Sequence, residues 1–173
     1  MRLLAAISAV GLAALTSVIA PSASSADGRT IPCAQSIATT KFPYLGSSRP
    51  EGRYRQVLGV VAVPPAYMRQ VVPTNQKPWA YWHKQGIVIR ATGQLVTVSV
   101  PARWRNLAAI TWGNGIGPVR SLRIQACRTS ADVGHAFAGG FLLRSRAACI
   151  PLIFRVGKRT ATVRFGVGQR CRR

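Results

Sequence analysis

Three pairs of arginines are the residues of this sequence best suited to bind a ligand. Arg53 and Arg55, Arg103 and Arg105, and Arg144 and Arg146 are each separated by one residue. On a β-strand, residues at i and i+2 point to the same face and lie roughly 6.5–7 Å apart along the chain. A guanidinium group can bind phosphate or carboxylate through two parallel hydrogen bonds. The spacing therefore predicts an anion-binding surface that contacts successive charged groups of an extended polymer.

The charge balance of the whole chain favours the same chemistry. The chain has 24 Lys and Arg residues, 20 of them Arg, against only 3 acids (Asp27, Glu51 and Asp132), for a formal net charge of +21. The alternative is that arginine only solvates an outer face and is enriched by a GC-rich genome. Neither explanation accounts for the shortage of acids, and a charge this one-sided costs self-repulsion. We expect anionic partners such as wall polymers, acidic polysaccharides, anionic lipid surfaces or extracellular nucleic acid.

Further arginines extend the expected surface. We expect Arg90, Arg123, Arg155 and Arg164 to occupy outward positions on strands and to form one basic face. The terminal Arg170, Arg172 and Arg173 would continue this face around Cys171.

An aromatic cluster, Trp79-Ala80-Tyr81-Trp82-His83, lies between Lys77 and Lys84. Exposed aromatic rings beside cations stack on sugars or bases, which makes Trp79 and Trp82 candidate stacking residues. The alternative is that Trp79 and Tyr81 face the core while Trp82 covers a sheet edge.

Residues suited to catalysis are scarce. Asp132 and His135 are the only acid and histidine that lie close in the sequence, and this makes them weak candidates for a hydrolase that uses a nearby serine. No Gly-x-Ser-x-Gly motif accompanies them, and the alternative is a polar loop between two strands. With two histidines and no Cys-x-x-Cys pair, we expect no metal site and no cofactor.

The amino terminus predicts export. Arg2, the apolar run from Leu3 to Ala20, and the small residues Ser24-Ser25-Ala26 have the order of a secretory signal peptide covering residues 1–26. An uncleaved membrane anchor is the alternative, since the run just reaches the length that spans a bilayer. Cleavage would leave a protein with no transmembrane segment, secreted to the cell exterior and able to associate with the cell wall.

Four cysteines in an exported chain predict two disulfides, for which three pairings exist. We favour Cys149–Cys171, which would close the last hairpin, together with Cys33–Cys127, which would tie the amino-terminal part to the body.

The elements that must position these residues are strands. Residues 95–100 and 122–126 alternate apolar and polar side chains, and residues 150–167 predict a hairpin that turns at residues 157–159. Weaker signals cover residues 54–63, 87–91, 108–112 and 137–143. Residues 27–50 predict an extended amino-terminal segment, and residues 51–173 a single domain. We expect an all-β, antiparallel β-sandwich of about seven or eight short strands, of immunoglobulin-like or jelly-roll-like form, with a closed barrel as the alternative.

Several segments resemble small exported basic proteins of unknown function from high-GC Gram-positive bacteria. They are VPPAY (63–67), ITWGNG (110–115), AGGF (138–141) and the stretch from Cys149 to Cys171. The resemblance implies export and a β fold, and no activity.

These features favour a non-enzymatic binding module for anionic polymers of the cell envelope or its surroundings. The alternatives are a hydrolase that uses His135 and Asp132, and a secreted antimicrobial or inhibitor protein.

Overall fold

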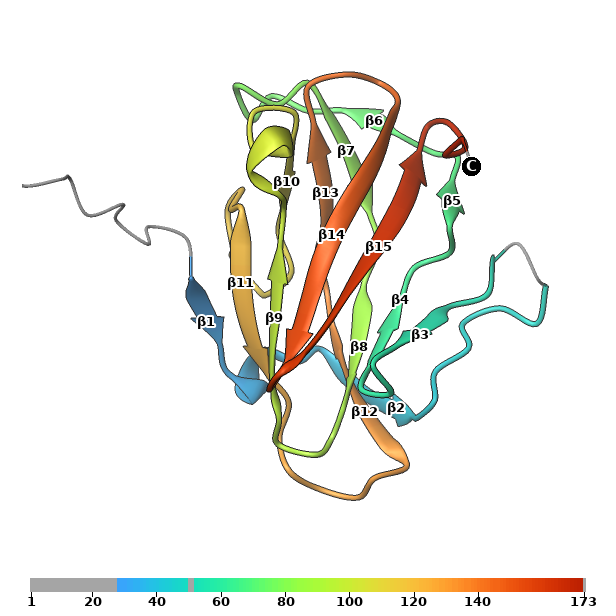
Figure 1. The fold of residues 1–173 in the computed structure, drawn as a ribbon, viewed down its shortest axis with the longest axis vertical. Helices are drawn as coiled ribbons and strands as arrows, with labels where there is room; N and C mark the ends of the chain where they lie inside the picture. The colour runs from blue at the N-terminus through green and yellow to red at the C-terminus, as the bar shows by residue number, and fades with distance from the viewer. Residues whose placement is uncertain (1–27, 50–51, 173) are drawn as a thin grey trace, which may run out of the picture.

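The protein is described by a computed structural model that covers residues 28–49 and 52–172, so the expected signal peptide lies outside it. Within these ranges the chain forms fifteen strands and short 3₁₀ helices (Figure 1). No helix in this part of the chain is both long and apolar enough to cross a membrane.

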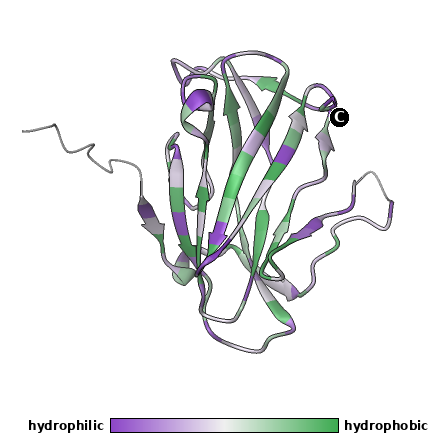
Figure 2. Cartoon of the chain, viewed as in Figure 1, coloured by the Kyte–Doolittle hydropathy of each residue, from purple (hydrophilic) through white to green (hydrophobic). Residues whose placement is uncertain are grey.

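One layer is a six-stranded sheet. Its order is β1 (Arg29–Ile31), β11 (Ser121–Gln125), β9 (Leu95–Ser99), β14 (Ala148–Val156), β15 (Arg159–Val167) and β5 (Tyr67–Met68). The predicted hairpin forms its longest pair, β14 and β15. Alternation decides which residues face inward: along β11, Leu122 and Ile124 are fully buried while Arg123 and Gln125 are exposed. The hydropathy colours of this strand alternate in the same way in Figure 2.

The second layer is formed by two sheets that continue into each other. The four-stranded sheet has the order β10 (Ala108–Ile110), β13 (Gly140–Leu143), β7 (Tyr81–Lys84) and β6 (Val72–Pro73). The five-stranded sheet has the order β2 (Ala38–Lys41), β12 (Val133–Phe137), β8 (Ile87–Arg90), β4 (Val61–Val63) and β3 (Arg55–Val57). Only two residues separate β7 from β8 and β12 from β13, so both strand pairs run from one sheet into the other.

The layers pack face to face through large apolar side chains. Phe141 of the four-stranded sheet lies 5.3 Å, between ring centroids, from Phe165 of the six-stranded sheet, and 5.3 Å from Trp112. All three side chains are fully buried and belong to one core that includes residues of all three sheets. The all-β fold is therefore confirmed, as a two-layered sandwich.

The sequence underestimated the number of strands because several are very short. The stretch 54–63 is a hairpin that turns at Leu58 and Gly59, both with positive φ, and the stretch 137–143 is divided at Gly139. A Cβ at Gly139 would lie 2.5 Å from the carbonyl oxygen of Thr111, so only glycine fits this corner.

The sheets also contain parallel pairs that an antiparallel sandwich does not predict. β1 pairs with β11 and β5 with β15, both at the edges of the six-stranded sheet. The described part of the segment 27–50 supplies strands β1 and β2 to the edges of two sheets, with the 3₁₀ helix η1 (Cys33–Gln35) between them.

Both favoured disulfides are confirmed. Cys33 is bonded to Cys127, with 5.0 Å between their Cα atoms, and Cys149 is bonded to Cys171, with 5.1 Å between their Cα atoms. No free cysteine remains in the described part of the chain.

Candidate anion-binding site

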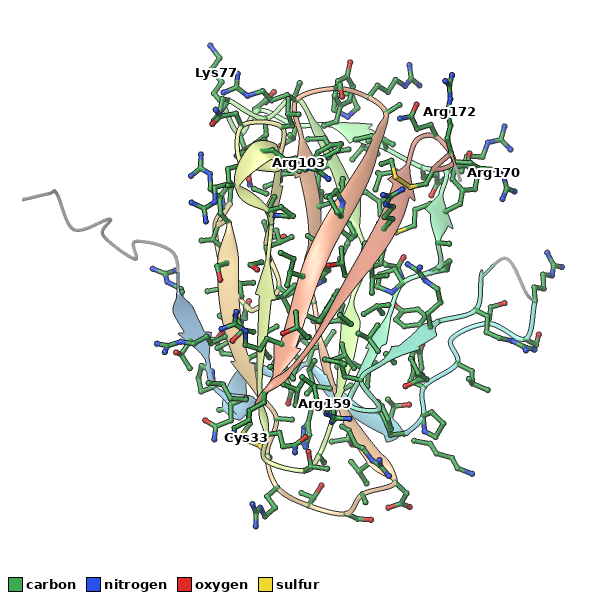
Figure 3. All side chains as sticks on the ribbon, in the orientation of Figure 1. Cys33, Lys77, Arg103, Arg159, Arg170 and Arg172 are labelled. Atoms are coloured by element: carbon green, nitrogen blue, oxygen red, sulfur yellow. A yellow bond between two sulfur atoms is a disulfide. The ribbon has the colours of Figure 1, made fainter. Side chains whose placement is uncertain are left out.

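The candidate site is an open hollow of about 500 Å³ that we call the arginine hollow. It is lined by Arg103, Trp104, Cys149, Pro151, Arg164, Gln169, Arg170 and Arg172. Arg103 and Trp104 come from the 3₁₀ helix η3 (Ala102–Trp104), Arg164 from the outer face of β15, and the last two arginines from the tail that follows β15. Figure 3 shows Arg103, Arg170 and Arg172 at the same end of the sandwich.

The Cys149–Cys171 disulfide places the tail beside the hollow. Cys171 stands between Arg170 and Arg172, and its partner Cys149 lies on the outward side of β14. The chain folds back sharply to reach this position. A Cβ at Gly166 would lie 2.3 Å from the carbonyl oxygen of Gln169, and a Cβ at Gly168 would lie 2.2 Å from that of Arg146. These close approaches require glycine at both positions.

Tyr67 orients one of the tail arginines. The Cζ atom of Arg170 lies 4.8 Å from the centroid of the Tyr67 ring, which is a cation–π contact. Because the ring occupies only one face of the guanidinium plane, the N–H groups at its edge stay free to bind an anion.

Within the described part of the chain, the arginines of the hollow have no hydrogen-bond acceptor. No side-chain nitrogen of Arg103, Arg164, Arg170 or Arg172 donates a hydrogen bond to another described residue. Asp132 is the one acid in the described ranges, and its carboxylate accepts a hydrogen bond from Ser130 in the loop before β12. That loop lies at the opposite end of the sandwich (Figures 1 and 3). Positive charge in the hollow is therefore not neutralised from within this part of the chain.

A neighbouring hollow of about 600 Å³ extends the basic surface. Arg69 and Arg146 line it together with Tyr67, Gln70, Val71, Ala147 and Gly168. Tyr67 thus contributes to the wall of this second hollow and also supports Arg170.

The outer face of the six-stranded sheet carries further arginines. Arg123 of β11 and Arg155 of β14 both pair with Thr97 of β9, so they lie in one row, two strands and about 10 Å apart. Both side chains are exposed, and Arg164 lies on the same face. The expected basic face is formed by these three residues and not by Arg90, which lies on β8 in the other layer and donates to the Ala131 carbonyl at 2.6 Å.

The first predicted pair, Arg53 and Arg55, is divided between two roles. Arg55 is half-buried, donates to the carbonyl oxygens of Pro64 and Arg164 at 3.2 Å each, and lies 4.8 Å over the ring of Phe165. Burial lowers the pKa of its guanidinium. Arg55 therefore stabilises the packing of β3 against β15, whereas Arg53 is exposed and donates to Ser48 at 3.4 Å.

The other two pairs do not lie on strands. Arg103 and Arg105 belong to η3 and its end, and Arg144 and Arg146 lie in the loop between β13 and β14, so the i and i+2 spacing does not apply to them. All four are exposed, but only Arg103 lines the arginine hollow and only Arg146 lines the second. Arg69 and Trp104 carried no sequence signal, because their position depends on chain segments distant in the sequence. Arg173 lies outside the described residues.

Trp79 is not available for stacking. It is 5% exposed and packs with Ala109 and Leu142, while Trp82 is half-buried against the same cluster.

The two catalytic candidates do not converge. His135 lies on β12 and not in a loop, is buried, and has its Nδ1 atom 3.4 Å from the Ser36 hydroxyl. Its Nε2 atom is buried without a hydrogen-bond partner. Asp132 is exposed and is held by Ser130. The geometry therefore brings a serine to His135 and leaves the acid apart. Within the described ranges, no group of three or more His, Cys, Asp and Glu residues is arranged to hold a metal.

No protein-family model, curated protein or solved structure matches this chain.

Proposed function

We propose that this chain is a non-enzymatic binding module that holds anionic polymers through the arginine hollow and the adjoining basic face. One observation carries the proposal: four arginines from three separate elements line one open hollow, and no described residue accepts a hydrogen bond from their side chains. Bringing like charges together is unfavourable, and an anionic ligand offsets that cost.

The arrangement suits a polymer better than a small ion. The hollow is open, and Arg164 belongs both to it and to the sheet face that carries Arg123 and Arg155. An extended polyanion can follow this face and place one charged group in the hollow. Binding would release counterions from the polymer, so affinity falls steeply as salt rises.

Two disulfides and an amino-terminal run typical of a signal peptide support a location outside the cell. We therefore place the ligand among polymers of the cell envelope, including the wall, or of its surroundings.

The test compares two triple variants on heparin and on purified cell wall, each eluted with a salt gradient. Arg103→Gln/Arg170→Gln/Arg172→Gln removes charge from the hollow. Arg49→Gln/Arg128→Gln/Arg159→Gln removes the same charge from exposed arginines that do not line it. We expect the first variant to elute at clearly lower salt than the second, and its plot of log affinity against log salt to become shallower by about 2–3.

Equal shifts for the two variants would mean that net charge alone retains the protein, and the proposal would then fail. Elution of the unmodified protein from both materials near physiological salt would have the same meaning.

A further inference from the structure

A row of apolar residues crosses the outer face of the four-stranded sheet. The strand registers align Ala109 of β10 with Leu142 of β13, Leu142 with Trp82 of β7, and Trp82 with Val72 of β6. Trp79 covers the Ala109 and Leu142 end of this row and is buried there. Trp82 is only half-buried, so part of its indole ring stays open to solvent.

The open part of Trp82 lines a hollow of about 410 Å³ that we call the Trp82 trough. One wall is the loop after β6, with Thr74 and Gln76, and the other is the glycine-rich loop that follows β10. The trough is lined by Thr74, Gln76, Trp82, Lys84, Thr111, Gly113, Asn114, Gly115, Ile116, Ala138, Gly139 and Leu142. This volume falls within the range of small-ligand sites, roughly 300–1,000 Å³.

Of the polar side chains that line the trough, the Thr74 hydroxyl accepts a hydrogen bond from the backbone N–H of Gln76 at 3.4 Å. Among the described residues, the amides of Gln76 and Asn114, the amine of Lys84 and the indole N–H of Trp82 make no side-chain hydrogen bond, and they surround an apolar floor. Amide groups both donate and accept, as a ring of hydroxyl groups requires.

None of the described residues that line the trough is an arginine, in a chain that has 20. Lys84 is the one charged residue among them, so a phosphate backbone would find little to bind here. This distinguishes the ligand of the trough from that of the arginine hollow, which lies on the other layer of the sandwich.

We propose that the Trp82 trough binds a pyranose ring of an oligosaccharide, neutral or with one carboxylate within reach of Lys84. The apolar C–H face of the sugar would stack on the indole of Trp82. Its hydroxyl groups would bind the amides of Gln76 and Asn114. This inference does not depend on the proposed function, because none of its residues lines the arginine hollow.

The experiment measures binding of cellotetraose, chitotetraose and tetragalacturonic acid by saturation-transfer NMR and calorimetry. We expect at least one tetramer to bind the trough. Because tetragalacturonic acid can also bind the arginine hollow, its binding is assigned to the trough only where Trp82→Ala lowers it. Trp82→Ala should lower the affinity about tenfold or more, whereas Trp82→Phe, which keeps an aromatic ring, should lower it less. Trp104→Ala removes a half-buried tryptophan from the arginine hollow and should leave binding of the two neutral tetramers unchanged.

Asn114→Ala, at an exposed loop position, provides a second test if Trp82→Ala does not fold, and it should weaken binding several-fold. Absence of binding to all three tetramers would overturn the inference, as would binding that neither Trp82→Ala nor Asn114→Ala weakens. Binding of free nucleotides in place of the tetramers would equally reject a sugar as the ligand. Heparin retention of Trp82→Ala and Asn114→Ala should not change, so failure here and failure of the proposed function are distinguishable.

Discussion

The guanidinium group of Arg170 lies over the ring of Tyr67, with 4.8 Å between its Cζ atom and the ring centroid. This contact links the tail that follows β15 to the edge strand β5, which also pairs with β15. Tyr67, far from the carboxyl terminus in the sequence, therefore orients the guanidinium group of Arg170, which lies close to that terminus. Such contacts stabilise exposed pairs by about 0.5–1 kcal/mol.

Replacement of this ring should weaken anion binding without a change in net charge. We expect Tyr67→Ala to lower heparin affinity about two- to fivefold, since Arg170 loses the support that orients it. Tyr67→Phe keeps the aromatic face and should bind nearly as well as the unmodified protein. Elution salt on heparin measures both variants, and equal losses for the two would show that the ring does not act through Arg170.

The two disulfides should differ in their effect on binding. Replacement of Cys149 and Cys171 by serine frees the tail, so we expect the anion affinity of the folded protein to fall together with its stability. Replacement of Cys33 and Cys127 should lower stability and leave the affinity of the folded protein unchanged, because neither residue lies at the arginine hollow.

Chain entropy sets the expected sizes of these losses of stability. The sequence separations of 22 and 94 residues correspond to about 3 and about 5 kcal/mol respectively. Urea unfolding measures stability, and heparin binding well below the unfolding transition measures affinity. Retained affinity in the Cys149/Cys171 variant would show that the tail stays in position without the bond.

Arg55 and Arg53 provide a matched comparison of a structural and an exposed arginine. Arg55→Ala removes two hydrogen bonds from a cation to backbone carbonyls and the contact with Phe165, so we expect a loss of about 2–3 kcal/mol. Arg53→Ala should change the free energy of unfolding by about 0.5 kcal/mol or less. The two variants remove the same charge and should have similar heparin elution. A stable Arg55→Ala variant with strongly reduced heparin binding would instead assign Arg55 to the ligand.

The free energy of unfolding should decrease as the pH is lowered, because His83 titrates. Burial lowers the pKa of this imidazole, against the opposing effect of its contact with the Gln70 carbonyl. The unfolded chain therefore binds more protons than the folded one once the pH drops below the unperturbed value of about 6.5. Stability contributed by neutral His83 is present above that pH and is lost as pH falls toward the lowered pKa.

We expect the midpoint temperature of thermal unfolding to decrease between about pH 7 and pH 5, and His83→Gln to reduce this dependence. An unchanged pH profile in the variant would exclude His83 as the group responsible.

Local sequence patterns predicted the structural features that depend on residues close together in the sequence. The alternation in residues 150–167 was sufficient to place the β14–β15 hairpin and its turn, because one face of each strand must be buried. The expected export and the even number of cysteines predicted two disulfides.

The site depended on relationships that no local pattern contains. Alternation along β7 predicts that Tyr81 and Trp82 point to opposite faces of the sheet. It does not reveal that the loop before β7 buries Trp79 against Leu142. Arg103 and Arg105 were expected on a strand, yet Pro101 precedes them and the chain forms a 3₁₀ turn there. Arg103 and Arg170 line the same hollow because tertiary contacts bring together residues far apart in the sequence.

The two disulfides join the cysteines in the order in which they occur, the first with the second and the third with the fourth. A chain that enters an oxidising compartment from its amino terminus presents Cys33 alone until Cys127 follows, and then presents Cys149 and Cys171. In such a compartment, oxidation in order of arrival would produce the native bonds directly. A chain exported in this way would have little need of thiol–disulfide exchange, which otherwise delays maturation by seconds to hours.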